Sequence, residues 1–357
     1  MRQLLAFVTT LGLSMCFLTA CSKTPEPVKI EGFAQGTTYH FTFVLPPLNG
    51  KKDSEQALVS QEFINKAITA ELARIDASIS NYRKDSSIEL FNAQLDTAPH
   101  EVNEEVVQLI EQARKISAAS NGCYDLTIKP LFDLWGFKKD VFNLPSDEAL
   151  QQTLQLVGID KLVTVDATHL QKTLPNLRVD LSSIGQGHSV GRIAELLEKH
   201  GVTNYLVEIG GELKARGKKP DGKPWRVALE KPLPNERKLS KIVAFNSGEP
   251  MSLMASGTYR HYFDNNGKRY SHILDARTGK PVEHNTVSVA VLHPNPAIAD
   301  AWSTALLCLG SEAGIKTANE HNIAALYVDQ HGEQLIEKKT KALNALKDVE
   351  LKEAEDN

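Results

Sequence analysis

Cysteine is scarce in this 357-residue sequence, and neither charge is in large excess. The four cysteines form no Cys-x-x-Cys pair and no cluster with histidine, which excludes a structural zinc site of the usual spacing. The formal net charge is −4, so the chain lacks the cationic surplus of a nucleic-acid-binding protein. We therefore expect neither zinc nor nucleic acid as a partner.

Long hydrophobic runs are also missing. The N-terminal apolar run in MRQLLAFVTTLGLSMCFLTAC is about 16 residues long, too short for a spanning helix and typical of a signal peptide. Its end, Leu18-Thr19-Ala20-Cys21, resembles a bacterial lipobox, in which the cysteine is lipidated. We expect a signal peptide over 1–20 and a lipidated tether over 21–29, with the protein held on the periplasmic side of a bacterial membrane through Cys21. A plain signal peptide with an incidental cysteine is the alternative.

Only Cys123 and Cys308 would remain in the mature domain. An oxidising compartment permits a disulfide between them. Two cysteines so far apart in the sequence more often lie separately, as small buried residues. We therefore expect no bridge.

The rest of the chain has an ordinary globular composition, with 41% hydrophobic and 24% charged residues. Apolar periodicity predicts helices over 56–79, 104–122, 146–158, 299–310 and 311–321. Strands dominate from Asn204 onward. Because helices and strands are partly segregated, we expect an α+β fold with antiparallel or mixed sheets flanked by helices. A single domain is expected over 30–340, followed by a frayed, charged tail over 341–357.

One stretch looks like a dinucleotide-binding fingerprint. The strand-like run LRVDLSSI is followed by Gly185, Gly187 and Gly191, then by an amphipathic helix and a strand carrying Glu208. A nicotinamide-binding Rossmann unit has this order, although the third glycine falls one place late for Gly-x-Gly-x-x-Gly. A nicotinamide-dependent dehydrogenase is therefore one possible function.

Two other patterns carry chemistry of a different kind. Asp300 and Thr304 are four residues apart in a predicted helix, so they share one face and offer the hard oxygen ligands that Mg²⁺ prefers. The same spacing is common in helix caps and surface pairs. His272 is expected inside an apolar strand, where a neutral imidazole could act as a general base or simply be a hydrogen-bonded core residue.

The order of these patterns along the chain resembles a known family. The matching blocks are GFAQGTTY, SNYRKDSSIELFN, GCYDLTIKPLFDLWGF, VDLSSIGQGHSVGR, NYLVEIGGELKARG, ASGTYRHYF, RYSHILDARTGKPV and ADAWSTALLCLG. Together they resemble the ApbE-like flavin transferases, the FAD:protein FMN transferases. That resemblance implies an α+β protein with a cleft for FAD and a requirement for Mg²⁺. It also implies transfer of FMN to a threonine hydroxyl of a membrane redox protein, a quinone reductase or related electron-transfer subunit, with release of AMP.

The resemblance also assigns roles to individual positions. Asp300 and Thr304 correspond to Mg²⁺ ligands, with a main-chain oxygen near Ser183 as a third, and His272 corresponds to the general base. The positions expected to contact FAD are Gln35, Tyr82, Cys123, Tyr124, Asp125, Asp180, Gln186 and Leu274.

Gln186 is the departure from the family pattern with the largest consequence, because the family usually has lysine there. A neutral amide cannot supply the charge that lysine offers to phosphate, although it can still form hydrogen bonds. Two related alternatives therefore remain: an enzyme that hydrolyses FAD to FMN and AMP, and a non-catalytic FAD-binding lipoprotein.

Overall fold

The computed structural model describes residues 26–46, 60–233 and 238–354. The expected signal peptide and Cys21 lie outside these residues. Within the described ranges, none of the helices combines the length and the apolar character needed to cross a membrane.

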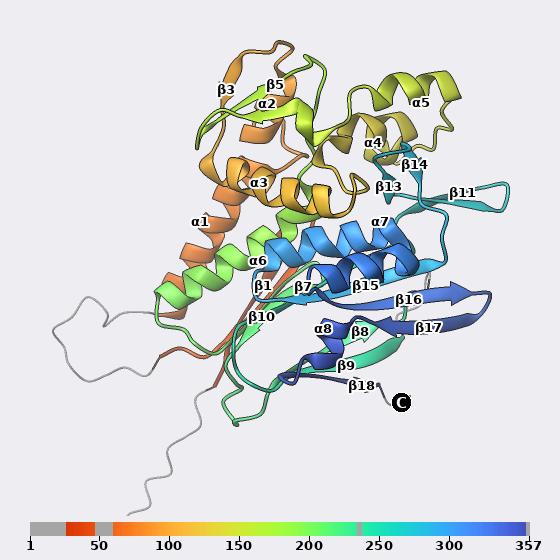
Figure 1. The fold of residues 1–357 in the computed structure, drawn as a ribbon. Helices are drawn as coiled ribbons and strands as arrows, with labels where there is room; N and C mark the ends of the chain where they lie inside the picture. Colours follow the sequence, from red (N-terminus) through yellow and green to blue (C-terminus); the bar gives the residue numbers. More distant parts are fainter. Residues whose placement is uncertain (1–25, 47–59, 234–237, 355–357) are drawn as a thin grey trace, which may run out of the picture.

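An eight-stranded sheet lies at the middle of the fold (Figure 1). Its order is β1-β2-β6-β7-β10-β15-β16-β17, and every neighbouring pair is antiparallel. The strands are β1 (Val28–Ala34), β2 (Thr37–Phe43), β6 (Tyr205–Ile209), β7 (Glu212–Arg216), β10 (Met251–Gly257), β15 (Thr286–His293), β16 (Ala324–His331) and β17 (Gln334–Lys339). The antiparallel pairing confirms the α+β prediction and excludes a Rossmann unit, which needs parallel strands.

Helices cover one face of this sheet, with α6 and α7 directly against it and α1 and α3 packed on them (Figure 1). The α-helices of the described ranges, on this face and elsewhere, are α1 (Gln61–Ile79), α2 (Ser87–Ala93), α3 (Glu104–Ala119), α4 (Lys129–Trp135), α5 (Asp147–Leu154), α6 (Ser182–Lys199), α7 (Pro296–Glu320) and α8 (Lys341–Ala345). Apolar side chains of the helices and of the inner sheet face form the largest core cluster. Burial of this face is the main source of stability.

A smaller sheet, β18-β9-β8, covers the opposite face of the large sheet and forms a second apolar cluster with it. Its strands are β8 (Trp225–Glu230), β9 (Leu239–Phe245) and β18 (Val349–Glu353). The expected frayed tail is therefore wrong for most of its length. Leu343 in α8 and Val349 in β18 are buried in this second cluster, and the charges around them concealed that role in the sequence.

The remaining short strands lie at the periphery. They are β3 (Pro99–Glu101), β4 (Leu162–Thr164), β5 (His169–Lys172), β11 (Tyr262–Asn265), β12 (Lys268–Ser271), β13 (Leu274–Asp275) and β14 (Lys280–Pro281). The hairpins β11–β12 and β13–β14 pack with α4 and α5 around a third cluster that includes Trp135 and Phe137. His272, which we expected within one strand, instead lies between β12 and β13.

The helix boundaries follow local chemistry. Ser60 and Ser146 cap α1 and α5 by accepting backbone N–H groups. The helix predicted to stop at Asn121-Gly122 does so, and both residues have positive φ. The two helices predicted on either side of Gly310 form α7, which is interrupted at that glycine (φ 71°, ψ 172°).

The run LRVDLSSI, expected as a strand, pairs with no neighbouring strand in the described structure, and helix α6 begins at Ser182. Two buried amides bind its backbone instead. Asn92 exchanges two hydrogen bonds with the backbone N–H and carbonyl of Val179 (2.7 and 2.8 Å). Asn81 binds the Val179 carbonyl and the Leu181 N–H. These side chains satisfy the backbone groups that a neighbouring strand would otherwise pair.

The glycines of GQGHSVG do not form a turn, so the interpretation of this stretch as a nicotinamide-binding Rossmann fingerprint is wrong. Gly185, Gly187 and Gly191 all lie within α6. A Cβ atom at Gly187 would lie 2.3 Å from the Pro296 carbonyl oxygen and 2.7 Å from Cβ of Asp300. Gly187 therefore lets α6 and α7 approach closely at the start of α7.

The expectation that the two domain cysteines stay apart is also wrong. Cys123 and Cys308 form a disulfide, with their Cα atoms 6.0 Å apart. A sequence separation of 185 residues carries no information on distance once α3 packs on α7 and brings the segment after α3 beside the middle of α7.

We predict that Gly187→Ala lowers the free energy of unfolding by about 2 kcal/mol, because the overpacking penalty exceeds the gain in helix propensity. Gly185→Ala is the matched control in the same helix, since its Cβ would meet only the flexible end of Ile79 at 3.2 Å. Urea unfolding measures both variants. Equal stability of the two would contradict the close-packing role of Gly187.

Candidate active site

A cavity of about 270 Å³ opens between the start of α6, the first half of α7 and the segment after α3. Most of the predicted site residues line it. They are Cys123, Tyr124, Asp125, Asp180, Ser183, Gln186, His272, Leu274, Asp300 and Thr304.

Two smaller cavities adjoin the main one and share lining residues with it. One, of about 180 Å³, is lined by Gln35, Tyr82 and Gln186, and the other, of about 140 Å³, by Tyr82, Asp180 and His272. The three cavities together form an elongated cleft. Every predicted site residue in the described ranges lines this cleft; the roles given to them remain predictions.

The face of α7 toward the cleft carries side-chain oxygen atoms that can serve as metal ligands. Asp300 is 6% exposed, and its Oδ2 accepts the Gly187 N–H at 2.8 Å. Burial raises the pKa of Asp300 to about 7. One turn later, the Thr304 and Ser256 hydroxyl groups are hydrogen-bonded at 3.1 Å. Both α7 side chains are thus held in place by neighbours from α6 and β10.

These residues fit a hard divalent cation. Asp300 has no ion-pair partner in the part of the chain that the structure describes, and a buried carboxylate is costly without a compensating positive charge. In a regular helix the Gly187 N–H donates to the Ser183 carbonyl, so Asp300 competes for that donor. The Ser183 carbonyl therefore keeps lone-pair capacity for a ligand, as the sequence-based prediction requires.

The geometry of His272 fixes its tautomer. Its Nδ1 lies 2.8 Å from the His261 carbonyl oxygen, which can only accept, so Nδ1 carries the proton and Nε2 keeps a free lone pair. Burial lowers the pKa of His272 to about 4. The ring is therefore neutral near pH 7, which is the state that a general base needs.

The wall after α3 is fixed by its own hydrogen bonds. The Asp125 carboxylate accepts the Thr127 N–H and hydroxyl on one oxygen and the Ile159 N–H on the other. These bonds commit the Asp125 carboxylate to holding the loop. On the adjacent residue, the Tyr124 hydroxyl accepts a hydrogen bond from Ser183 (3.2 Å), which joins this wall to α6.

Gln186 lines both the main cavity and the adjoining smaller cavity, and Gln35 lines the smaller one. The Gln186 Nε2 atom would be only 2.6 Å from a Cβ at Gly210, so this glycine makes room for the glutamine side chain. Gln35 is at the β1–β2 turn with φ 54°, and its Nε2 donates to Ser189 in α6 (2.7 Å). Tyr82 is 79% exposed at the cleft rim, as an open aromatic surface.

The sequence-based prediction missed several cleft residues, of which Glu212 is the most unusual. Glu212 is 8% exposed, and both of its oxygens accept the Ala255 N–H (3.0 and 3.3 Å). Burial and then the nearby Asp300 charge raise its pKa well above the ordinary value. Arg260 and the His261 ring, which stacks on His272 with centroids 5.4 Å apart, were also missed. The charged side chain directly after Gly210-Gly211 was the available signal for Glu212.

Known proteins are similar to this chain in both fold and sequence. A family model described as the ApbE family matches residues 35–327. The FAD:protein FMN transferase of Haemophilus influenzae is 34% identical over 355 residues, covering 97% of this chain and 99% of the relative. The solved structure of flavin transferase ApbE from Vibrio cholerae has a TM-score of 0.79 at 32% identity, covering 90% of this chain and 99% of that one. The apo crystal structure of the Pseudomonas stutzeri flavinyl transferase ApbE also has a TM-score of 0.79, at 35% identity and with coverage of 90% and 96%.

The family match includes residues of the main cavity and of the smaller one, from Gln35 in the smaller cavity to Asp300 and Thr304 on α7. It agrees with the order of the motif blocks in the sequence, so the family predicted from them is confirmed. The chain belongs to the ApbE family.

Proposed function

We propose that this protein is an FAD:protein FMN transferase that links FMN to a threonine hydroxyl of a partner protein and releases AMP. The observation that carries the proposal is the convergence of Asp300, Thr304 and His272 on one cavity. Oxygen ligands for a cation and a neutral imidazole are the two components that this reaction needs. The relatives named above, an FAD:protein FMN transferase and a flavin transferase, support the same chemistry.

In the proposed reaction, the threonine oxygen attacks the phosphorus on the FMN side of the FAD pyrophosphate. A new phosphorus–oxygen bond forms, the bond to the bridging oxygen breaks, and AMP leaves with that oxygen. A threonine hydroxyl is a weak nucleophile, so its proton must be removed as the bond forms. Nε2 of His272 is the acceptor for that proton, because Nδ1 is already bound to the His261 carbonyl.

Mg²⁺ would be held by the side chains of Asp300 and Thr304 and the main-chain oxygen of Ser183. It would neutralise charge on the pyrophosphate. The Gly187 N–H keeps Asp300 Oδ2 oriented, and Ser256 orients the Thr304 hydroxyl. Tyr82, Tyr124 and Leu274 offer apolar and aromatic surface for the flavin nucleotide along the same cleft.

We further propose that the acceptor is a membrane redox protein, a quinone reductase or related electron-transfer subunit, and that Cys21 is lipidated and holds the enzyme on the periplasmic side. The lipobox-like sequence before Cys21 supports this placement. A lipid anchor would restrict the enzyme to the surface on which such an acceptor lies.

The central experiment combines the protein with FAD, Mg²⁺ and a panel of candidate acceptors. We expect AMP release together with covalent flavin fluorescence on a denaturing gel, and we expect EDTA to abolish both, because the pyrophosphate charge is then uncompensated. An acceptor with its target threonine changed to alanine is the control. AMP without labelling of any acceptor would favour an FAD hydrolase, and bound FAD without AMP would favour a binding protein.

His272→Ala is expected to lower the transfer rate about 10²- to 10⁴-fold while FAD still binds, because only the proton acceptor is lost. His100→Ala is the matched control, since His100 pairs with Asp96 on β3, away from the cleft residues. Single-turnover labelling measures the rate, and flavin fluorescence measures FAD affinity. A normal rate in His272→Ala would remove its assignment as the base.

The same assignment predicts the acid side of the pH profile. The pKa of His272 is lowered from 6.5 to about 4, so the base is lost only as the pH falls through about 4. Its titration therefore leaves the rate unchanged between about pH 6 and 8. An inflection near pH 6.5 that disappears in His272→Ala would contradict the neutral, buried state of the ring.

Gln186→Lys is expected to raise FAD affinity by about tenfold at low salt, because it adds a positive charge beside the proposed pyrophosphate position. The gain should shrink at high salt, as screening predicts. Gln186→Met is the uncharged control of similar length. Equal FAD affinities of the lysine and methionine variants in fluorescence titrations would show that charge at this position does not limit binding.

A further inference from the structure

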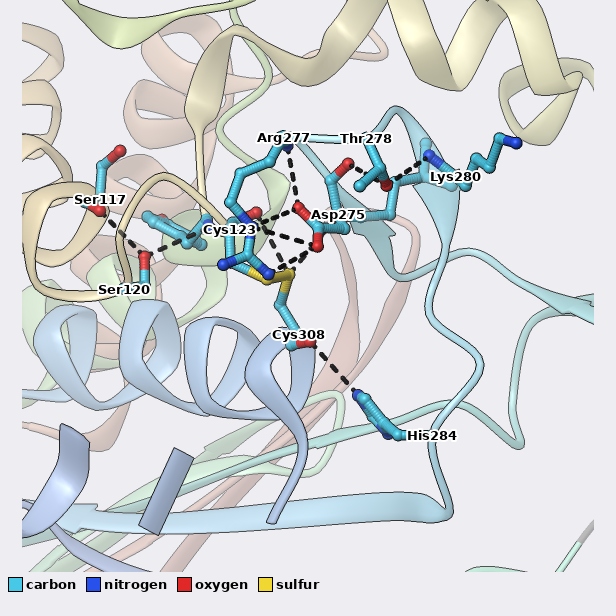
Figure 2. Close-up of a disulfide and its surroundings, with 11 residues drawn as sticks. Ser117, Ser120, Cys123, Asp275, Arg277, Thr278, Lys280, His284 and Cys308 are labelled. Atoms are coloured by element: carbon cyan, nitrogen blue, oxygen red, sulfur yellow. Dashed lines mark hydrogen bonds and ion pairs between the residues drawn. A yellow bond between two sulfur atoms is a disulfide. The ribbon is translucent and has the colours of Figure 1, made fainter. Parts of the chain in front are cut away.

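Three walls of the cleft meet at the Cys123–Cys308 disulfide (Figure 2). Cys123 begins the segment that continues into Tyr124 and Asp125, and Cys308 is on α7. Both cysteines line the main cavity. The third wall is the strand that follows His272: the Ala276 N–H donates to the Cys123 carbonyl (3.1 Å), and Cys308 Sγ lies 3.8 Å from the Leu274 carbonyl oxygen.

Cys308 continues the face of α7 that carries the proposed metal ligands. Asp300, Thr304 and Cys308 are spaced by four residues, so they lie one above another on one side of the helix. All three line the same cavity. The disulfide therefore joins the segment after α3 to the same face of α7 that carries the two oxygen ligands.

The disulfide also lies next to the interruption of α7. Gly310 interrupts the helix two residues after Cys308, so the carbonyl groups before it lose their regular helical donors. His284 lies over Gly310, and its Nε2 is 3.3 Å from the Cys308 carbonyl oxygen (Figure 2). The disulfide therefore ties α7 to the segment after α3 within two residues of this interruption.

We propose that the Cys123–Cys308 disulfide is a positioning element for catalysis, and that FMN transfer is efficient only while this bond is formed. It fixes the α7 face with Asp300 and Thr304 against the segment of Tyr124 and against the strand that follows His272. The proposal rests on the proposed function, because it assigns the cleft to FAD and a cation.

Reduction would release the three walls from one another. A water-soluble phosphine breaks the sulfur–sulfur bond and supplies two electrons, two protons from water complete the thiols, and the water oxygen ends on the phosphine oxide. Asp275 lies beside both sulfurs and pairs with Arg277 at 2.7 Å (Figure 2). Both cysteines are buried, at 0% and 4% exposure, so the cavity is the route by which a reductant reaches them. FAD in the cleft should therefore slow reduction.

The test compares oxidised full-length protein in detergent with the same protein after phosphine treatment and with the Cys123→Ala/Cys308→Ala double variant. Alkylation and peptide mass measurement report the state of the two cysteines. We expect kcat/KM for FAD to fall about tenfold or more in both altered forms, since displacements near 1 Å at a catalytic site are costly. We also expect a higher Mg²⁺ concentration for half-maximal activity, and reoxidation should restore both values.

Global destabilisation is separated from positioning by a matched control. Val243→Ala removes buried methyl groups from the second core cluster, away from the cleft, and lowers stability without touching the site. At a temperature well below all melting transitions, this variant should keep the kcat/KM for FAD of the oxidised wild type. A fall in kcat/KM in Val243→Ala equal to that in the double variant would reduce the disulfide to a stabilising role and overturn the proposal.

Two further outcomes distinguish this inference from the proposed function. If the oxidised protein transfers FMN and the reduced protein has the same kcat/KM within about twofold, the positioning role is wrong and the function stands. If the oxidised protein neither releases AMP nor labels an acceptor, the proposed function is wrong. In that case the catalytic part of the inference falls with the function, and FAD titrations test only the positioning of the cleft walls: tighter binding by the oxidised form supports that positioning, and equal binding overturns it.

Discussion

The contact between Gly187 on α6 and Asp300 on α7 is the interaction on which the arrangement of the cleft depends. Without a side chain at Gly187, the two helices approach until the Gly187 N–H binds Asp300 Oδ2 at 2.8 Å. That approach places Ser183 and Gln186, in the first turns of α6, beside the carboxylate. Gly187 therefore has two roles: it allows close packing of α6 against α7, and its N–H orients Asp300, a proposed metal ligand.

The buried carboxyl groups of the cleft favour a ligand that brings positive charge. Asp300 and Glu212 are both buried at its base, and burial raises the pKa of each carboxyl group. Neither has an ion-pair partner within residues 26–46, 60–233 and 238–354. A divalent cation with a pyrophosphate would supply positive charge and further oxygen donors beside these two carboxyl groups, in addition to the Arg260 side chain that lines the same cavity.

Much of this architecture could be predicted from the sequence, and the failures have physical causes. Helical periodicity and caps located α1, α3, α5 and the interruption of α7, because these signals are local. The ordered motif blocks located Asp300, Thr304 and His272. Local signals could not reveal the disulfide, which depends on how α3 packs on α7. They also misassigned LRVDLSSI, because the partners of its backbone are Asn81 and Asn92, about 90 to 100 residues away along the chain.

The hydrogen bonds of Asn81 and Asn92 limit which side chains can replace them. Each presents an amide N–H to the Val179 carbonyl and an amide oxygen to the backbone N–H of a residue next to Asp180, Val179 for Asn92 and Leu181 for Asn81. Aspartate has nearly the same shape, but it would turn the donor into an acceptor and set two oxygens against each other in a buried place. Volume therefore does not define which substitutions these positions accept. The direction of the hydrogen bond to the Val179 carbonyl does, because that bond holds the chain that leads into the cleft.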